Sequence, residues 1–391
     1  MGTDVARWAA GGALALSGPP EGRPLGPPDL LVAGLDAVTV HFPGLDGVQV
    51  LAERAALTGL TRRGRTSCGG ATRLLQAADG WLAVSLPRAT DLDLLPAWLP
   101  GRRLEAPDPA RAWAAVRSAV AEGKAAELAE RAIPLGLAVA MLPPEGSTPG
   151  RSPVLARRLG DAPGRDDLRG LRVVDLTSLW AGPLCGDLLG RLGADVIKVE
   201  SVHRPDGARS GSPDFFALLN GGKRSVALDF AGPAGRAALA RLVASADVVL
   251  EASRPRALEQ LGLKAADVTG PQIWVSITGY GRDAPLRVAF GDDAAVGGGL
   301  VVSDDSGPYF CADAVADPAT GLTAAHACVE ALRQGGRWLL DIAMSAVAAE
   351  LSGPSRRVPR DNVAEAPRAR SPRAPAAPLG ADTATVLAAL P

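Results

Sequence analysis

The strongest candidate for a chemically active residue is Asp317, in the run Ala316-Asp317-Pro318-Ala319-Thr320-Gly321. An Asp followed by Pro at the start of a helix-forming stretch predicts that Asp317 is the N-cap of a helix reaching about Arg333. A capping carboxylate needs no chemical role, and spacing alone favours that interpretation. The same geometry also holds the carboxylate among helix N–H groups, which keep it ionised and directed outward. Asp317 is therefore also a candidate catalytic carboxylate.

A second candidate is the turn Trp180-Ala181-Gly182-Pro183, which lies between a predicted strand and a predicted helix. Unpaired N–H groups at the start of such a helix favour an anionic ligand, for example a phosphate. The turn can equally be a plain structural connection of an α/β unit. Its glycine spacing does not match G-x-G-x-x-G, which disfavours a dinucleotide site.

Cysteine usage argues against a metal site and against a disulfide framework. The four cysteines are far apart and show no C-x-x-C or Cys/His ligand spacing. They are Cys68, Cys185, Cys311 and Cys328. Because free cysteines are typical of reducing compartments, we expect a cytoplasmic protein without a bound metal.

The overall charge excludes binding of polyanions by bulk electrostatics. Lys plus Arg number 41 and Asp plus Glu number 42, so no net field attracts nucleic acid or an anionic membrane. No 18 apolar residues run together without charge or proline, so no transmembrane helix is expected. The apolar stretch Trp8–Leu16 follows Asp4 and has only Arg7 as a nearby cation, which disfavours a signal peptide.

An α/β fold must position these residues. Apolar runs typical of buried strands alternate with helical spacing, which predicts βαβ units and a doubly wound, mostly parallel, Rossmann-like sheet. The predicted strands are Leu171–Leu176, Ala194–Val199, Ser225–Leu228, Ala246–Leu250 and Ile273–Ile277, and the predicted helices are Pro183–Leu192 and Gly232–Ala244. Such sheets place ligands beyond the carboxyl ends of their strands.

Two shifts in composition divide the chain. Residues 1–150 are predicted to form a second, smaller α+β domain, with a strand at Trp81–Leu86 and one long helix at Pro109–Arg131. Proline, glycine and arginine dominate the next stretch, so residues 151–167 are predicted to be a linker. Residues 168–350 form the predicted Rossmann-like domain. Residues 351–391 are a Pro/Arg-rich, poorly ordered tail with a short helix at Asp382–Leu390.

Several motifs together resemble the class III CoA-transferase family, also called CaiB/BaiF, which includes formyl-CoA transferase, carnitine CoA-transferase and α-methylacyl-CoA racemase. The matching motifs follow the family's order across about residues 168–350. They are LRGLRVVDLTSLWAGPLCGDLLGRLGADVIKVE (168–200), FALLNGGKRSVALD (216–229), ADVVLEASRPRALEQLGL (246–263), SITGYG (276–281) and residues 316–332. Cys68–Val84 resembles part of the family's small domain, and Ala374–Leu390 resembles its C-terminal end. The resemblance thus implies either a rearranged segment order or two unequal family modules, of which the first is truncated.

The resemblance implies an enzyme that moves coenzyme A from an acyl-CoA to a carboxylic acid. Asp317 aligns with the family's nucleophilic aspartate, which forms a mixed anhydride and then an aspartyl-CoA thioester. Gly69 and Gly70 match the glycine loop that covers the family's active site, although paired glycines can also form a plain tight turn. Coenzyme A is then a substrate and product, no metal takes part, and an interlocked homodimer is the family's assembly.

The resemblance also implies positions that contact coenzyme A. They are Leu228, Asp229 and Phe230, together with Arg254 and Arg256 in the segment Glu251–Arg256, while Arg204 and Arg209 are further cations that can neutralise phosphates. The chain departs from the family at Trp180, Ala252 and Gln260, where glutamine, asparagine and arginine are found in relatives. These departures leave the pose of CoA and the acyl specificity open.

Two alternatives to CoA transfer stay open. The racemase branch uses a histidine beside an aspartate as one of two bases, and the matching place here reads Phe290-Gly291-Asp292-Asp293. Gly291 removes that imidazole, which weakens this alternative. Asp292 and Asp293 can bind a polar acceptor, but a solvated turn is the favoured interpretation. The other alternative is a non-catalytic CoA-binding paralogue, against which the presence of Asp317 argues.

Overall fold

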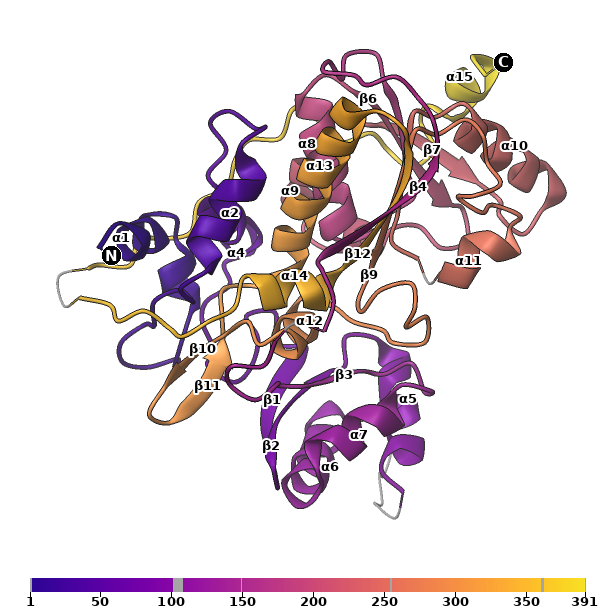
Figure 1. Ribbon diagram of the computed structural model, residues 1–391. Coiled ribbons are helices and arrows are strands. Elements are labelled where there is room, and N and C mark those ends of the chain that lie inside the picture. Colours follow the sequence, from indigo (N-terminus) through magenta and orange to yellow (C-terminus); the bar gives the residue numbers. More distant parts are fainter. Residues whose placement is uncertain (1, 101–107, 149, 254, 360–361, 391) are drawn as a thin grey trace.

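The computed structural model describes residues 2–100, 108–148, 150–253, 255–359 and 362–390. Its main feature within these residues is a seven-stranded sheet with the order β4-β12-β9-β8-β5-β6-β7 (Figure 1). All neighbours pair in parallel except β4, which joins β12 antiparallel at one edge. The strands are β4 (Val154–Gly160), β5 (Arg172–Asp175), β6 (Asp195–Ser201), β7 (Arg224–Leu228), β8 (Val248–Glu251), β9 (Ile273–Thr278) and β12 (Arg337–Ala343). The predicted parallel α/β sheet is confirmed.

Alternation along each central strand explains how the sheet is buried on both faces. Val173 belongs to the core cluster with helices α8 (Ala181–Arg191) and α13 (Ala316–Gln334), whereas the next residue, Val174, belongs to the cluster with α10 (Pro233–Ala244). Successive side chains of a strand point to opposite faces, so a continuous Val/Leu/Ile run fills both layers. Further helices around this sheet include α9 (Pro213–Asn220), α11 (Pro255–Gln260), α12 (Gly291–Gly297), α14 (Met344–Glu350) and the 3-10 turn η2 (Gly207–Ser210).

A smaller antiparallel sheet, β1-β2-β3, forms the lower part of the molecule in Figure 1. Its elements are β1 (Thr72–Ala77), β2 (Gly80–Ser85), β3 (Ala138–Met141), α5 (Ala89–Trp98), α6 (Pro109–Glu122) and α7 (Ala125–Ala132), which share a separate core. We call residues 72–141 the small sheet unit. The single helix predicted over 109–131 is wrong, because the chain leaves helical geometry at Gly123 and Lys124.

The first 60 residues do not belong to the small sheet unit, contrary to the single unit predicted over 1–150. Trp8, Leu14 and Leu31 are buried in the same core cluster as α8 and α13. Their elements are α1 (Gly2–Ala10), η1 (Ala13–Leu16), α2 (Leu31–Thr39), α3 (Gly47–Val50) and α4 (Glu53–Thr58), and the hairpin β10 (Val301–Asp304) and β11 (Gly307–Phe310) also joins this region. Apolar burial over α8 and α13 decides this arrangement.

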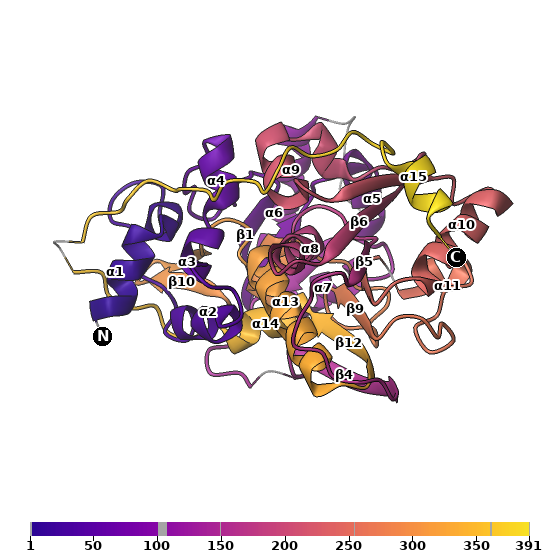
Figure 2. The ribbon, with the colours of Figure 1, turned by 90° about the horizontal axis from the view of Figure 1, so that it is seen from above.

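The predicted linker and tail are both more structured than their composition indicates. Residues 154–160 of the linker are β4, whose backbone pairs with β12. In the tail, Arg370 bonds both carboxylate oxygens of Glu53 at 2.5 and 2.9 Å, and Asp382 accepts a hydrogen bond from Ser225 N at 2.8 Å. Figure 2 shows the tail passing α4 and α9 before it reaches α15 (Thr383–Ala388). The short helix predicted near the end of the tail is therefore confirmed.

Candidate active site

Asp317 is the second residue of α13, so its prediction as the N-cap is wrong. Val315 occupies the cap position without a side-chain capping bond, and Asp317 N donates to Ala314 O at 2.8 Å. The Asp317 side chain is half-buried rather than directed into solvent. Burial raises its pKa to about 7, the nearby charge of Arg54 opposes this rise, and Asp292 and Asp313 add to it.

Arg54 and Asp313 form the charged centre beside Asp317. Arg54 Nε and Nη2 donate to the two carboxylate oxygens of Asp313 at 2.8 and 2.6 Å, and the Asp313 side chain is fully buried. Such a two-point contact fixes both groups in one orientation. Neither residue was predicted as part of a site, because they are 259 positions apart and neither lies in a distinctive motif.

The same guanidinium connects this centre to Trp180. Arg54 lies over the Trp180 ring, 5.1 Å from its centroid, and Phe215 packs edge-on against the same indole. Trp180 directly precedes α8 and is 2% exposed. The indole therefore forms a wall beside Arg54, on the side of the sheet where β5 ends.

Backbone strain concentrates at this place. Within the described residues, the non-glycine residues with positive φ are Leu179 (70°), Ala312 (52°) and Ala314 (45°). Two of them flank Asp313 and the third precedes Trp180. Left-handed backbone at residues with a Cβ costs free energy and persists where surrounding contacts enforce it, often at functional sites.

Asp292 and Asp293 are not in a solvated turn, which corrects the interpretation favoured by the sequence. They lie in the first turn of α12, where Asp293 Oδ1 accepts a hydrogen bond from Ser85 Oγ at 2.7 Å. Ser85 Oγ contacts Thr72 Oγ1 at 2.8 Å, and Thr72 Oγ1 lies 3.3 Å from Asp292 Oδ2. Burial raises the pKa of Asp292 to about 6 and that of Asp293 to about 7. This chain of polar groups joins the small sheet unit to the surroundings of Asp317.

Gly291 touches the Asp317 carboxylate. A Cβ at this position would collide with Asp317 Oδ2 and Ala314 O, and the Gly291 backbone hydrogen-bonds to the carboxylate, which lowers its pKa. A side chain at position 291 therefore requires Asp317 to move.

The glycine turn Cys68–Gly70 also reaches this centre. Gly70 N donates to Ser67 O at 2.8 Å, and Cys68 Sγ lies 3.5 Å from Ala312 O. A Cβ on Gly69 would lie 3.4 Å from Arg54 Nη2. The structure thus brings Gly69 and Gly70 together with Arg54 and the strained segment before Asp317.

Those predicted CoA-contacting residues that the structure describes lie elsewhere, at and after the carboxyl end of β7 and in α11. Leu228 is buried and Phe230 packs against the second core cluster, while the exposed Asp229 accepts a hydrogen bond from Ala231 N at 2.9 Å. Arg256 is exposed, and Arg254 lies outside the described residues.

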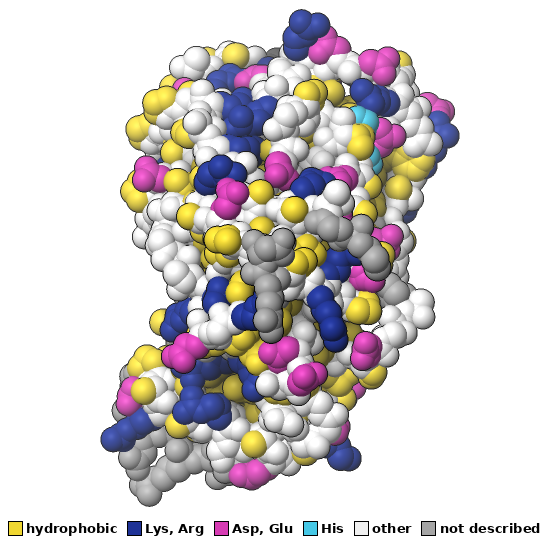
Figure 3. Space-filling model, turned by 90° about the vertical axis from the view of Figure 1, so that its left-hand side faces the viewer, with side chains coloured by type: hydrophobic (Ala, Val, Ile, Leu, Met, Phe, Trp, Pro, Cys, Tyr) yellow, Lys and Arg dark blue, Asp and Glu magenta, His cyan; other side chains and the backbone are white. Residues whose placement is uncertain are grey.

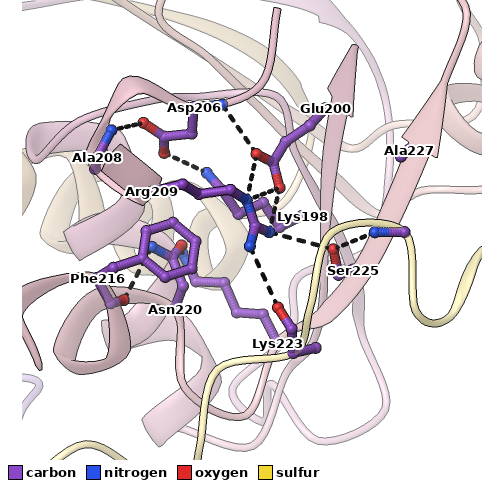
Figure 4. Close-up of polar contacts among 12 residues, drawn as sticks. Lys198, Glu200, Asp206, Ala208, Arg209, Phe216, Asn220, Lys223, Ser225 and Ala227 are labelled. Atoms are coloured by element: carbon purple, nitrogen blue, oxygen red, sulfur yellow. Dashed lines mark hydrogen bonds and ion pairs between the residues drawn. The ribbon is translucent and has the colours of Figure 1, made fainter. Parts of the chain in front are cut away.

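Arg209 is already neutralised by protein groups, so its prediction as a phosphate ligand is not supported. Its guanidinium bonds Glu200 at 2.6 and 2.9 Å and stacks on Phe216 (Figure 4). Lys198 pairs with Asp206 and Lys223 with Asp175, each at 2.8 Å, around the ends of β5 and β6. Arg204 is exposed beside this network.

Comparison with known proteins decides the family. The family model described as CoA-transferase family III matches residues 168–377, more than half of the chain. The chain belongs to CoA-transferase family III.

Curated relatives of this family III chain carry CoA-transferase names. A succinate–glutarate CoA-transferase of Agrobacterium fabrum is 34% identical over 210 residues, covering 47% of this chain and 52% of the relative. A succinyl-CoA:glutarate CoA-transferase of Mus musculus is 36% identical over 207 residues, covering 49% and 48%. A crystal structure of a CaiB/BaiF family protein from Brucella suis is 35% identical with a TM-score of 0.44, covering 47% of this chain and 55% of that one. The chain spans about half the length of the curated relatives it matches.

The remaining observations on this family III chain concern its cysteines, its possible metal ligands and the length of its apolar helices. All four cysteines are free and buried. In the part of the chain that the structure describes, no group of three His, Cys, Asp or Glu side chains is arranged to hold a metal ion, and no helix is long and apolar enough to cross a membrane.

Proposed function

We propose that this chain transfers coenzyme A from an acyl-CoA to a carboxylic acid, with Asp317 as nucleophile. The observation that supports this most directly is the half-buried Asp317 carboxylate beside Gly291 and the Arg54–Asp313 pair. Asp317 lies inside the segment that matches the family. A carboxylate without a full hydration shell is a stronger nucleophile once it is ionised, and Arg54 supplies the charge that favours ionisation.

The proposed reaction has four covalent steps. A carboxylate oxygen of Asp317 attacks the thioester carbonyl carbon, and the C–S bond breaks to give a mixed anhydride and CoA thiolate. The thiolate attacks the aspartyl carbonyl carbon, and the donor acid leaves as its carboxylate. The acceptor carboxylate then attacks the aspartyl thioester and expels the thiolate. Attack of the thiolate on the acceptor carbonyl forms the new acyl-CoA and restores Asp317.

Each tetrahedral intermediate needs hydrogen-bond donors for its oxyanion. Gly70 N–H already donates to Ser67 O, so Gly69 N–H is the better candidate in the glycine turn. Gly69 is exposed and lies next to Arg54, which places a small, adaptable backbone segment beside the charged centre.

The racemase alternative lacks its histidine base, because position 291 is a glycine. In deuterated water we therefore expect the protein to exchange CoA between carboxylates without placing deuterium on the α-carbon of a 2-methylacyl-CoA, as followed by mass spectrometry. Rapid α-exchange without CoA transfer would favour the racemase and overturn the proposed function.

The pH dependence of transfer should report the ionisation of Asp317. Because the anion is the nucleophile and its pKa is raised to about 7, the rate should fall as pH decreases through 7 and level off above it. Asp292 and Asp293 titrate in the same range, so the observed midpoint belongs to the coupled group. The measurement is kcat/KM from pH 5 to 9 with a saturating acceptor. A flat profile would contradict the assignment.

We further propose that the protein is a homodimer, as the resemblance implies, and that it is cytoplasmic, as the cysteine usage predicts. Sedimentation at micromolar concentration should give twice the chain mass of 39.8 kDa, and a monomer would refute this. A threaded dimer cannot separate without unfolding, so it should survive dilution, whereas an ordinary interface follows mass action. Reversible dissociation of folded subunits would exclude threading alone.

A further inference from the structure

Three arginines lie on the outer side of the glycine turn. Arg63 precedes the turn, Arg73 lies on β1 and Arg117 on α6. Within the described residues no ion pair joins any of the three to an acid, in contrast to Arg54 and Arg88, which pair with Asp313 and Asp91. Figure 3 shows Lys and Arg side chains gathered on the lower part of one face, at the height of the small sheet unit.

Backbone pairing and ring stacking bring the three side chains together. Thr66 bridges to both Arg63 and Arg73, so the chain before the turn runs beside β1. Arg73 stacks over Trp113 at 4.3 Å from the ring centroid, and Arg117 follows Trp113 by one turn of α6. These contacts place Arg63, Arg73 and Arg117 on adjoining segments of the fold, although they carry like charge.

The glycine turn connects this arginine cluster (Arg63, Arg73 and Arg117) to the charged centre. Gly70 has φ of 82°, and a Cβ there would lie 2.7 Å from Arg63 Nη1, so the Arg63 guanidinium lies against the turn. On the other side, Gly69 faces Arg54. A ligand extending past the turn from Asp317 would reach the arginine cluster.

The cluster has unused hydrogen-bonding capacity. Arg73 Nε is buried and has no hydrogen-bond partner among the described residues. Burial lowers the pKa of Arg73, and the charges of Arg117 and Arg63 lower it further. An unsatisfied buried donor among like charges is unfavourable, and an oxyanion would relieve both costs at once.

We propose that Arg63, Arg73 and Arg117 form a binding site for an oxyanion carried by a substrate, a carboxylate or a phosphate remote from the reacting carbonyl. The inference rests on the proposed function only in assigning the oxyanion to a substrate. The arginine cluster would hold the far end of that molecule while the glycine turn lies across its middle. Guanidinium groups suit this role because they bind both anions through paired N–H donors.

The test measures binding rather than turnover. Affinities of the full chain for succinate, butyrate, CoA and 3′-dephospho-CoA are compared by titration calorimetry in wild type and in Arg63→Gln/Arg117→Gln. Both replaced residues are exposed, so the fold should persist. The control is Arg111→Gln, on the same helix but paired with Asp108.

We expect the double variant to bind one anionic probe about tenfold more weakly, while the matched probe lacking that anion is unaffected. A loss for succinate but not butyrate identifies a carboxylate, and a loss for CoA but not 3′-dephospho-CoA identifies a phosphate. Unchanged affinity for all four overturns the site, as does an equal loss in Arg111→Gln or a wild type that distinguishes neither pair. Normal turnover by Asp317→Ala would instead overturn the proposed function, so the two failures are distinguishable.

Discussion

Replacing Asp317 with alanine should abolish CoA transfer and the covalent aspartyl adduct, lowering kcat by about 10⁴-fold or more. The carboxylate oxygen forms the first bond in the proposed reaction, and its Oδ2 lies directly against Gly291. The substitution removes no capping bond, since the cap of α13 is Val315. It also removes a half-buried acid whose ionisation the fold disfavours, so the free energy of unfolding should change little.

The measurement is mass spectrometry of protein incubated with a panel of acyl-CoA thioesters, followed by hydroxylamine, alongside steady-state transfer rates. Asp305→Ala, an exposed aspartate in the β10–β11 hairpin, serves as the control and should retain full activity. Asp317→Asn is a poorer test because deamidation can restore the acid. Normal turnover in a folded Asp317→Ala protein would contradict the proposed mechanism.

Replacing Arg54 with methionine should produce the largest loss of stability among the residues around Asp317. The substitution leaves the fully buried Asp313 carboxylate without its two-point partner, which typically costs about 3–5 kcal/mol. It also removes the positive charge that lowers the pKa of Asp317, so the midpoint of the pH–rate profile should rise. Urea denaturation and kcat/KM against pH report the two effects separately.

A double variant separates these roles. Arg54→Met/Asp313→Leu removes both charges, and apolar replacement of a buried pair is often close to neutral in stability. We expect it to recover most of the lost free energy of unfolding but not the rate at neutral pH. Arg7→Met, which breaks the exposed pair with Asp36, should cost at most about 1 kcal/mol. Equal destabilisation by Arg54→Met and Arg7→Met would show that the Arg54–Asp313 pair contributes no special stability.

Local sequence patterns were sufficient to predict the parallel sheet next to which the candidate site lies. Runs such as Arg172–Asp175 and Ile273–Thr278 are apolar over the length of one strand, and the helices between them show their own periodicity and caps. These signals depend only on residues a few positions apart, so they do not change when whole segments stand in a different order. The same holds for the family motifs, which pointed to Asp317 and to the glycine turn.

Tertiary structure alone decided the environment of Asp317. The N-terminal helices were predicted to join a separate small domain, but burial of Trp8 and Leu31 against the core of α8 and α13 brings α4, and with it Arg54, beside Asp313. Asp292 and Asp293, read as a solvated turn, are enclosed by Thr72 and Ser85 from strands more than two hundred positions away. Charge pairing and desolvation depend on the groups that pack within a few ångströms of a side chain. When those groups come from residues far away in the sequence, a pattern a few residues long does not indicate them.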